Sequence, residues 1–249
     1  VLLEAIGAPP SQLDGDAEMK VGTDPLIGMK PLFDGYFKQR LEEPGNDLMT
    51  ELSQSTFRDG SGLPFETMSL MARFLFGAGQ DTTSRLIAMA MLILANDKAL
   101  QDRLRAEPAK IPDFLEEVLR YDPPVKVGYR LAVRNTELAG QQVPAGTVAT
   151  ICLTGANHDP RHFDNPEKFD IDRPNARDHM AFSRGLHGCP GAPLARMESR
   201  IAIERILART TDIRLSEERH GPPDARRYNF EQTFSFRSLS DLYIEFTAA

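Results

Sequence analysis

The sequence is poor in several residue types that mark particular classes of protein. It has no tryptophan, and its 249 residues include two cysteines, Cys152 and Cys189, without the pattern of a disulfide framework. Lys and Arg number 29 against 36 for Asp and Glu, so the net charge is −7 and the basic face of a general nucleic-acid-binding protein is missing. We therefore expect no nucleic-acid partner and a reducing compartment.

Long apolar segments are also missing. The longest unbroken apolar run, residues 86–95, is ten residues long, which is too short to span a bilayer and is typical of a buried core helix. No charged and apolar leader opens the chain. These absences predict a cytoplasmic protein with no membrane partner. The hydrophobic share of 41% is ordinary and allows a sizeable core.

The apolar residues along most of the chain have the spacing of amphipathic helices. Pro44 and Gly45 end one pattern, and Pro64 suits the first turn of the longest one. Helices are expected at about residues 29–43, 64–95, 97–106, 112–121 and from after Cys189 to Arg209. Short β-rich pieces follow residue 125, at 128–133, 136–140, 147–153 and 240–246, and the composition of 158–175 indicates a long loop. The sequence predicts a mainly α fold with a minor antiparallel β component.

The stretch AFSRGLHGCPGAPLARMESR, residues 181–200, places Cys189 among three glycines and directly before a helical pattern. A helix N-terminus lowers the pKa of a nearby thiol, and glycines let the backbone lie close to the sulfur or to a flat molecule. His187 is spaced to offer a donor to an anion beside such a molecule. One cysteine cannot hold zinc or an iron–sulfur cluster, whereas haem needs only one ligand from the protein.

The segment FSRGLHGCPG, residues 182–191, resembles F-x-x-G-x-H-x-C-x-G, the haem-ligand loop of the cytochrome P-450 family. This resemblance implies haem b (iron protoporphyrin IX), with Cys189 as the axial ligand of the iron. It also implies haem-binding roles for Phe182, His187 and Gly191. The alternative is an inert buried cysteine in a glycine turn.

A second motif, AGQDTT at residues 78–83, lies inside the longest expected helix. Glycine in mid-helix costs about 1 kcal/mol relative to alanine, so Gly79 needs an explanation. The resemblance implies that Ala78 and Gly79 leave room for dioxygen where this helix crosses the haem, with a local opening of the helix. It further implies that Asp81, through water, and Thr82 deliver protons. Alternatively, Asp81 is a solvated charge and Thr82 has no special role.

A third motif, EEVLRYDPPV, places Glu117 and Arg120 three residues apart on a helix, close enough to pair. It resembles the E-x-x-R element of the family, and the resemblance adds Arg173 from the later loop HFDNPEKFDIDRP. The implied role is structural, as a buried charge network that holds the proximal loop under the haem. The apolar anchors of that loop would be Phe163, Pro166 and Phe169.

Arg130 lies in the expected hairpin VGYRLAVRNTELAGQQVPAG, which also resembles the family. The resemblance implies that Arg130 pairs with a haem propionate and that His187 shares this role. Arg130 as a strand-edge charge is the alternative. The remaining histidines, His158, His162, His179 and His220, are expected at the surface or in packing, and Cys152 in the core.

Two features depart from the family pattern. Pro190 stands where an aliphatic residue is more usual, and it offers no N–H to the sulfur, which predicts a lower iron potential. The resemblance also covers only the second half of the family's length, or somewhat more. Residues 1–249 are therefore expected to form the C-terminal portion of one cytochrome P-450 domain.

The resemblance implies a bacterial-type monooxygenase that inserts one oxygen atom of O2 into an apolar organic substrate, with electrons from a ferredoxin or flavodoxin. A docking patch of Arg184, Arg196 and Arg200 is one possibility, and a solvated face is the other. Alternative functions are a peroxygenase, isomerase or dehydratase, or an inactive haem-free fragment. The residues implied to line the substrate pocket are Leu75, Ala78, Val125, Val127 and Phe234.

Overall fold

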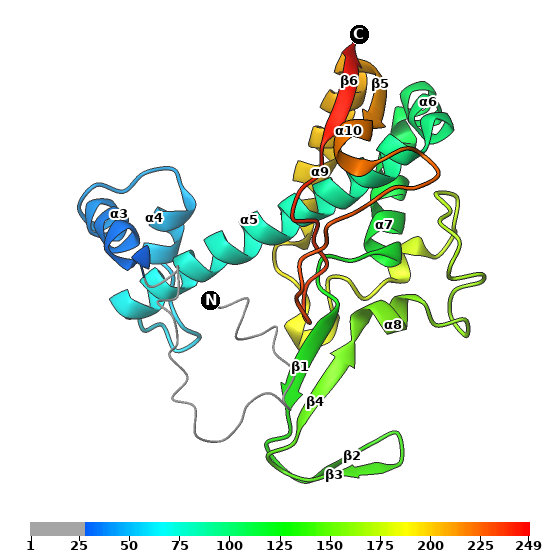
Figure 1. Ribbon diagram of the computed structural model, residues 1–249. Helices are drawn as coiled ribbons and strands as arrows, with labels where there is room; N and C mark the ends of the chain where they lie inside the picture. The colour runs from blue at the N-terminus through cyan, green and yellow to red at the C-terminus, as the bar shows by residue number, and fades with distance from the viewer. Residues whose placement is uncertain (1–27) are drawn as a thin grey trace. The chain divides into compact units, whose positions relative to one another are not determined.

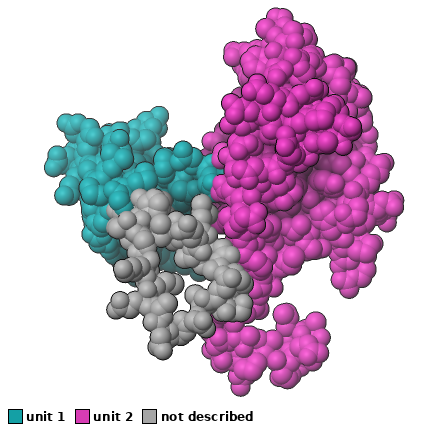
Figure 2. Space-filling model, in the orientation of Figure 1, with its two compact units in different colours: residues 1–81 teal, residues 82–249 magenta. Residues whose placement is uncertain are grey.

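The computed structural model describes residues 28–249 (Figure 1). They divide into two compact units (Figure 2). The boundary follows Asp81 and falls within helix α5, Phe65–Asn96. Each unit has its own apolar core, and each is described separately below. The expected helix at 64–95 is confirmed to within one residue at either end.

The first unit contains α3 (Lys30–Glu42), α4 (Leu48–Ser53) and the first part of α5. Its core includes Phe33 and Phe37 from α3, and Phe37 is fully buried. Asp47 caps α4 by accepting a hydrogen bond from the Thr50 amide at 2.9 Å, and its other carboxylate oxygen pairs with Arg40 at 2.5 Å. One carboxylate therefore fixes the turn between the two helices.

The second unit is built around α7 (Ile111–Tyr121), whose residues are mostly buried, and α9 (Ala192–Arg209) (Figure 1). α7 packs against α9, and α6 (Lys98–Ala106) packs against α9 and β5 (Thr210–Leu215). The Gln101 amide, 1% exposed, donates to the carbonyls of Leu94 and Ile213 and accepts from the Ile213 amide. This side chain joins the end of α5 to β5. The short helices are α8 (Leu153–Asn157) and α10 (Glu217–His220), with the 3-10 turn η2 (Pro108–Lys110).

Within residues 28–249 the strands form three two-stranded antiparallel sheets. β1 (Val127–Leu131) pairs with β4 (Val148–Cys152), β2 (Thr136–Leu138) with β3 (Gln141–Val143), and β5 with β6 (Ile244–Ala248). The β2–β3 turn uses Ala139 and Gly140, both with positive φ, as tight hairpins require. The expected fold class, mainly α with a minor antiparallel β component, is confirmed.

Cys152 corrects one expectation, because its thiol is exposed and not in the core. It is the last residue of β4 and also caps α8, where its sulfur accepts from the Gly155 amide at 3.3 Å. The apolar residues on either side of Cys152 predicted that it would be buried. The chain instead turns into the short helix α8 at Leu153, and the side chain of Leu153 is buried in place of the Cys152 thiol.

Candidate functional site

The loop before Cys189 is closed by backbone hydrogen bonds. The Cys189 amide donates to the Phe182 carbonyl at 2.8 Å, and the Ser183 amide donates to the Met180 carbonyl at 2.8 Å. The 3-10 turn η4 (Gly185–His187) lies between, with Gly185 at φ +69°. Only glycine adopts that conformation without strain, which explains the first glycine of the motif. Ser183 is also left-handed, at φ +56°.

The Cys189 thiol is exposed at the start of α9, where Gly191 is the N-cap residue. A Cβ added at Gly191 would lie 3.8 Å from the sulfur, which is an ordinary van der Waals contact, so the backbone at Gly191 lies close to the sulfur. No donor in residues 28–249 forms a hydrogen bond to the sulfur. The sulfur is therefore accessible to a flat molecule beside the loop, and the inert buried cysteine of the alternative reading is not what the structure shows.

Arg130 supplies a cation, and His187 supplies an imidazole that can donate a hydrogen bond, for anionic groups. The Arg130 Nη1 donates to the Tyr129 carbonyl at 2.8 Å, and no described carboxylate pairs with Arg130. His187 is exposed at the end of η4. The remaining N–H groups of the Arg130 guanidinium can bind a carboxylate in a bidentate manner, which the ammonium group of a lysine cannot do. Both residues remain predicted propionate partners.

Glu117, Arg120 and Arg173 form one buried charge network. Arg120 binds Glu117 through two hydrogen bonds of 2.8 Å, and Arg173 Nε lies 3.2 Å from each Glu117 oxygen. Glu117 and Arg120 are 0% exposed, and the Arg173 side chain is 6% exposed. A buried carboxylate thus has two guanidinium partners, which compensates for the loss of its hydration.

The same network holds the loop at 157–173 through its backbone. Arg120 donates to the carbonyls of Asn157, Pro166 and Lys168, at 2.9–3.2 Å. Arg173 donates to the carbonyls of Asp164, Asn165 and Lys168, at 2.7–3.3 Å. The Phe163 ring, 1% exposed, lies 5.5 Å from the Arg120 guanidinium carbon. A long segment without regular structure is therefore fixed by two arginines.

Ala78, Gly79, Asp81 and Thr82 all lie in α5, which is helical throughout Phe65–Asn96. The local opening of the helix that was expected here is therefore absent. A glycine destabilises a helix by only about 1 kcal/mol, and the long helical segments on either side outweigh that cost. A Cβ added at Gly79 would have no described neighbour within 4 Å, so described packing does not require glycine there. Asp81 and Thr82 are half-buried. Their catalytic roles stay predictions.

The predicted substrate-lining residues come from separate segments. In the second unit, Val125 bridges to Phe236, and the Lys126 amide donates to the Ser235 carbonyl at 2.8 Å. This pairing places the segment of Val125 beside that of Phe234, which is 42% exposed. Val127 is buried. Leu75, half-buried, and Ala78, exposed, belong to the first unit, so their role at a common pocket stays a prediction.

A second buried cluster, centred on Glu116, was not predicted from the sequence. Glu116, the residue before Glu117, binds His179 and Arg196. His179 is in packing, as expected, while Arg196 is tied to this carboxylate as well as being part of the possible docking patch. The sequence feature that could have indicated this cluster is the pair Glu116–Glu117 on a helix with a strongly apolar face. Two adjacent buried acids require two separate sets of basic partners.

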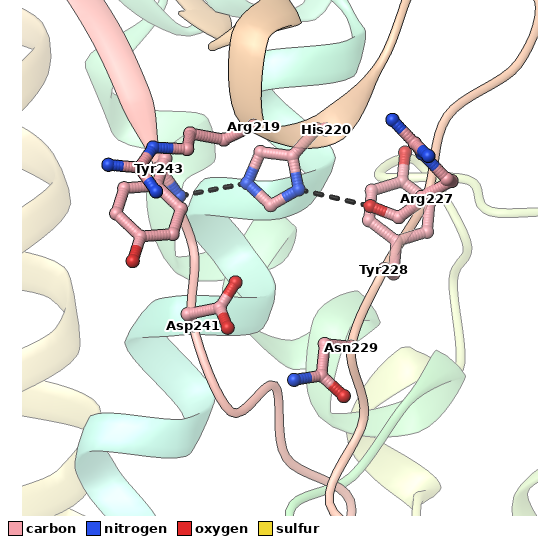
Figure 3. Close-up of a pocket in the computed structure, with 7 residues that line it drawn as sticks. All are labelled: Arg219, His220, Arg227, Tyr228, Asn229, Asp241 and Tyr243. Atoms are coloured by element: carbon pink, nitrogen blue, oxygen red, sulfur yellow. Dashed lines mark hydrogen bonds between the residues drawn. The ribbon is translucent and has the colours of Figure 1, made fainter.

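A cavity of about 380 Å³ in the second unit is lined by none of the predicted site residues (Figure 3). His220, 2% exposed, is one of the lining residues, and its Nε2 accepts from the Tyr243 amide at 2.9 Å while its Nδ1 donates to the Arg227 carbonyl at 3.1 Å. The Arg219 guanidinium carbon lies 4.7 Å from the centre of the Tyr243 ring. The imidazole therefore joins two segments of the tail and is not free to act in catalysis.

Residues 28–249 contain no cluster of three or more His, Cys, Asp or Glu that could hold a metal, and no helix in that range has the length and apolar character to cross a membrane. The groups present fit an iron porphyrin: one exposed sulfur in a glycine-rich loop, an exposed imidazole, and a guanidinium that pairs with no carboxylate among residues 28–249. A mainly helical fold with this donor set defines the class of haem-thiolate proteins.

The family model for "Cytochrome P-450" matches residues 36–223. The chain belongs to the cytochrome P-450 family.

The chain is similar to bacterial members of this family. It is 38% identical to the cytochrome P-450 monooxygenase PikC of Streptomyces venezuelae over 186 residues, covering 73% of this chain and 44% of the relative. Identity to the cytochrome P-450 CYP107DY1 of Priestia megaterium is 35%, covering 98% of this chain and 61% of the relative. The chain thus spans about half the length of these curated relatives.

Solved structures show the same fold. The substrate-free cytochrome P-450 CYP150A6 of Mycobacterium marinum matches with a TM-score of 0.87 and 44% identity, covering 100% of this chain and 61% of that one. P450BioI, solved with an acyl carrier protein ligated to hexadec-9Z-enoic acid, matches with a TM-score of 0.79 and 30% identity. That match covers 88% of this chain and 53% of the other.

Proposed function

We propose that the protein is a haem-thiolate monooxygenase and that residues 1–249 form the C-terminal portion of its single cytochrome P-450 domain. The observation that carries this proposal is the exposed Cys189 sulfur at the N-terminus of α9, in a loop closed on Phe182. Family membership supports it. Haem b, when bound, supplies dioxygen activation, and Cys189 is its ligand.

The chain's own residues orient the haem and handle protons. Arg130 and His187 hold the two propionates, and Phe182 and Gly191 shape the loop against the ring. Asp81 and Thr82 place a carboxylate beside a hydroxyl on α5, an arrangement that can pass protons one at a time from water to the distal side. The products are a hydroxylated or epoxidised molecule and water, from one O2, two electrons and two protons.

The substrate is an apolar organic molecule, because the candidate lining side chains are Leu75, Ala78, Val125, Val127 and Phe234. A substrate carried by an acyl carrier protein is compatible with the likeness to P450BioI. Electrons come from a ferredoxin or flavodoxin. Arg184 and Arg200 are candidate contacts for such an acidic partner; Arg184 pairs with Asp178 at 3.7 Å and Arg200 pairs with Glu204 at 2.8 Å.

Turnover of the intact, haem-loaded protein tests this proposal. We expect product formation with a ferredoxin, its reductase and O2, with one labelled oxygen atom from O2 in the product. Thr82→Ala should still consume reducing equivalents but release more of them as hydrogen peroxide. Turnover that occurs with hydrogen peroxide but not with the ferredoxin, its reductase and O2 would contradict the monooxygenase assignment. Coupling unchanged in Thr82→Ala would contradict the proton role of Thr82.

A further inference from the structure

The second buried cluster is centred on Glu116. Its side chain is 4% exposed, and its two oxygens accept Arg196 Nε at 2.6 Å and Arg196 Nη2 at 3.0 Å. One of them also accepts His179 Nε2 at 3.1 Å. Burial alone would raise the pKa of the Glu116 carboxyl, but the hydrogen bonds from His179 and Arg196 and the charge of Arg196 outweigh it and lower that pKa to about 2. The carboxylate is therefore ionised at neutral pH.

His179 has only one tautomer that fits its contacts when neutral. Nδ1 accepts a hydrogen bond from the Ala181 amide at 3.1 Å, so the ring proton is on Nε2, which donates to Glu116. The ring is 2% exposed and lies 5.8 Å from the ring of Phe182. His179 thus joins α7 to the backbone where the chain enters the Cys189 loop.

Arg196 reaches the same loop from the other side. It lies on α9, seven residues after Cys189, and its guanidinium carbon is 4.6 Å from the centre of the Phe182 ring. Phe182 in turn accepts the hydrogen bond from the Cys189 amide. The pKa of Arg196 is raised, mainly by its hydrogen bond to Glu116. Arg196 therefore links the Glu116 carboxylate to the residue whose carbonyl holds the Cys189 amide.

We propose that Glu116, His179 and Arg196 are positioning residues for the proximal ligand: they fix Phe182 and the Cys189 loop so that the sulfur stays bound to iron as a thiolate. This inference rests on the proposed haem-thiolate function. Glu117 and its arginines hold residues 157–173, whereas the Glu116 cluster contacts the residues that flank Cys189. Partners of a metal ligand typically affect metal affinity 10–100-fold when removed.

The variants that test this are Glu116→Gln, which removes the charge at constant shape, and His179→Leu, which removes the donor. His179→Gln is the conservative variant, since its amide can still donate from a similar position. Glu204→Gln is the matched control, because Glu204 forms an exposed ion pair with Arg200 on the same helix as Arg196. Arg196→Lys, at a partly exposed position, keeps the charge but loses the bidentate contact.

Two readouts separate positioning from general stability in the intact protein loaded with haem. The first is the rate of haem transfer to excess apomyoglobin, and the second is the share of thiolate-type band in the reduced carbon monoxide spectrum. Both are measured where circular dichroism shows each variant to be folded. We expect about tenfold faster haem loss and a smaller thiolate-type share in Glu116→Gln, His179→Leu and Arg196→Lys. His179→Gln and Glu204→Gln should match the wild type.

The inference is overturned if the thiolate-type share and haem loss of Glu116→Gln and His179→Leu match those of Glu204→Gln, even where their unfolding midpoints fall. It is also overturned if His179→Gln is as impaired as His179→Leu, because the Nε2 donor would then not matter. A wild-type protein that binds haem without a thiolate-type band would contradict the proposed function itself, which is a separate outcome.

Discussion

Two neighbouring glutamates of α7 are buried side by side and serve different segments. Glu117 is 0% exposed and binds Arg120 and Arg173, whose remaining donors hold backbone carbonyls between Asn157 and Lys168. Glu116 binds His179 and Arg196, which contact the loop that carries Cys189. The first network supports a long irregular segment, and the second supports the residues around one sulfur. Equal burial therefore does not mean an equal role.

Glu117→Gln is expected to have the largest effect. It leaves Arg120, which is fully buried, without a carboxylate, and breaking a buried ion pair from one side costs about 3–5 kcal/mol. Because proteins are stable by only about 5–15 kcal/mol, we expect low soluble yield and a large fall in the free energy of unfolding, measured by urea titration. A loss within about 1 kcal/mol of that in Glu204→Gln would show that the network is not structural.

Asn157→Ala tests the link between the two networks. Asn157 is fully buried, its carbonyl accepts from Arg120 at 3.0 Å, and its side-chain oxygen accepts from the Met180 amide at 2.6 Å. Removing the side chain leaves a partly buried amide without its acceptor, which costs about 1–3 kcal/mol. Urea unfolding of the haem-free and haem-loaded forms should show the loss in both. A loss in neither would mean that the networks are independent of Asn157.

The acid stability of the Glu116 cluster sharpens the comparison further. The pKa of Glu116 is lowered from 4.5 to about 2, so its contribution to stability is complete above pH 4.5 and is lost as the pH falls toward 2. The difference in unfolding free energy between wild type and Glu116→Gln should therefore shrink over this range. Asp159 and Asp172 titrate in the same range but are present in both proteins, so their contributions cancel. A constant difference would contradict the lowered pKa.

Ser183→Gly is expected to have the smallest effect. Ser183 is left-handed at φ +56° between Phe182 and the turn at Gly185, and this conformation costs a residue with a Cβ about 1–2 kcal/mol. Glycine removes the strain but loses more chain entropy on folding, so we expect a stabilisation of about 0.5–1 kcal/mol at most in thermal unfolding. Destabilisation beyond about 1 kcal/mol would mean that the serine side chain holds the loop.

Much of this molecule could be predicted from the sequence because its elements have strong local signals. Proline and glycine punctuation and apolar spacing located α3, α5, α7 and α9 to within a few residues. The F-x-x-G-x-H-x-C-x-G motif located the Cys189 loop, since a left-handed Gly185 requires a glycine wherever this turn occurs.

Other features depend on contacts between distant segments, which no local pattern encodes. Cys152 looked buried because its neighbours are apolar, but the chain turns into α8 at that point and exposes it. The Glu116 cluster joins residues 63 and 80 positions apart, so neither His179 nor Arg196 could be assigned to it from spacing. Pairing across such distances is determined by tertiary packing alone.

The measurement that tests the account most directly is the reduced carbon monoxide spectrum of the intact, haem-loaded protein and of its Cys189→Ala variant. The account predicts a thiolate-type band in the wild type and none in the variant. A thiolate-type band that persists in Cys189→Ala, or a wild-type protein whose bound haem never shows one, would contradict the assignment of Cys189 as the iron ligand.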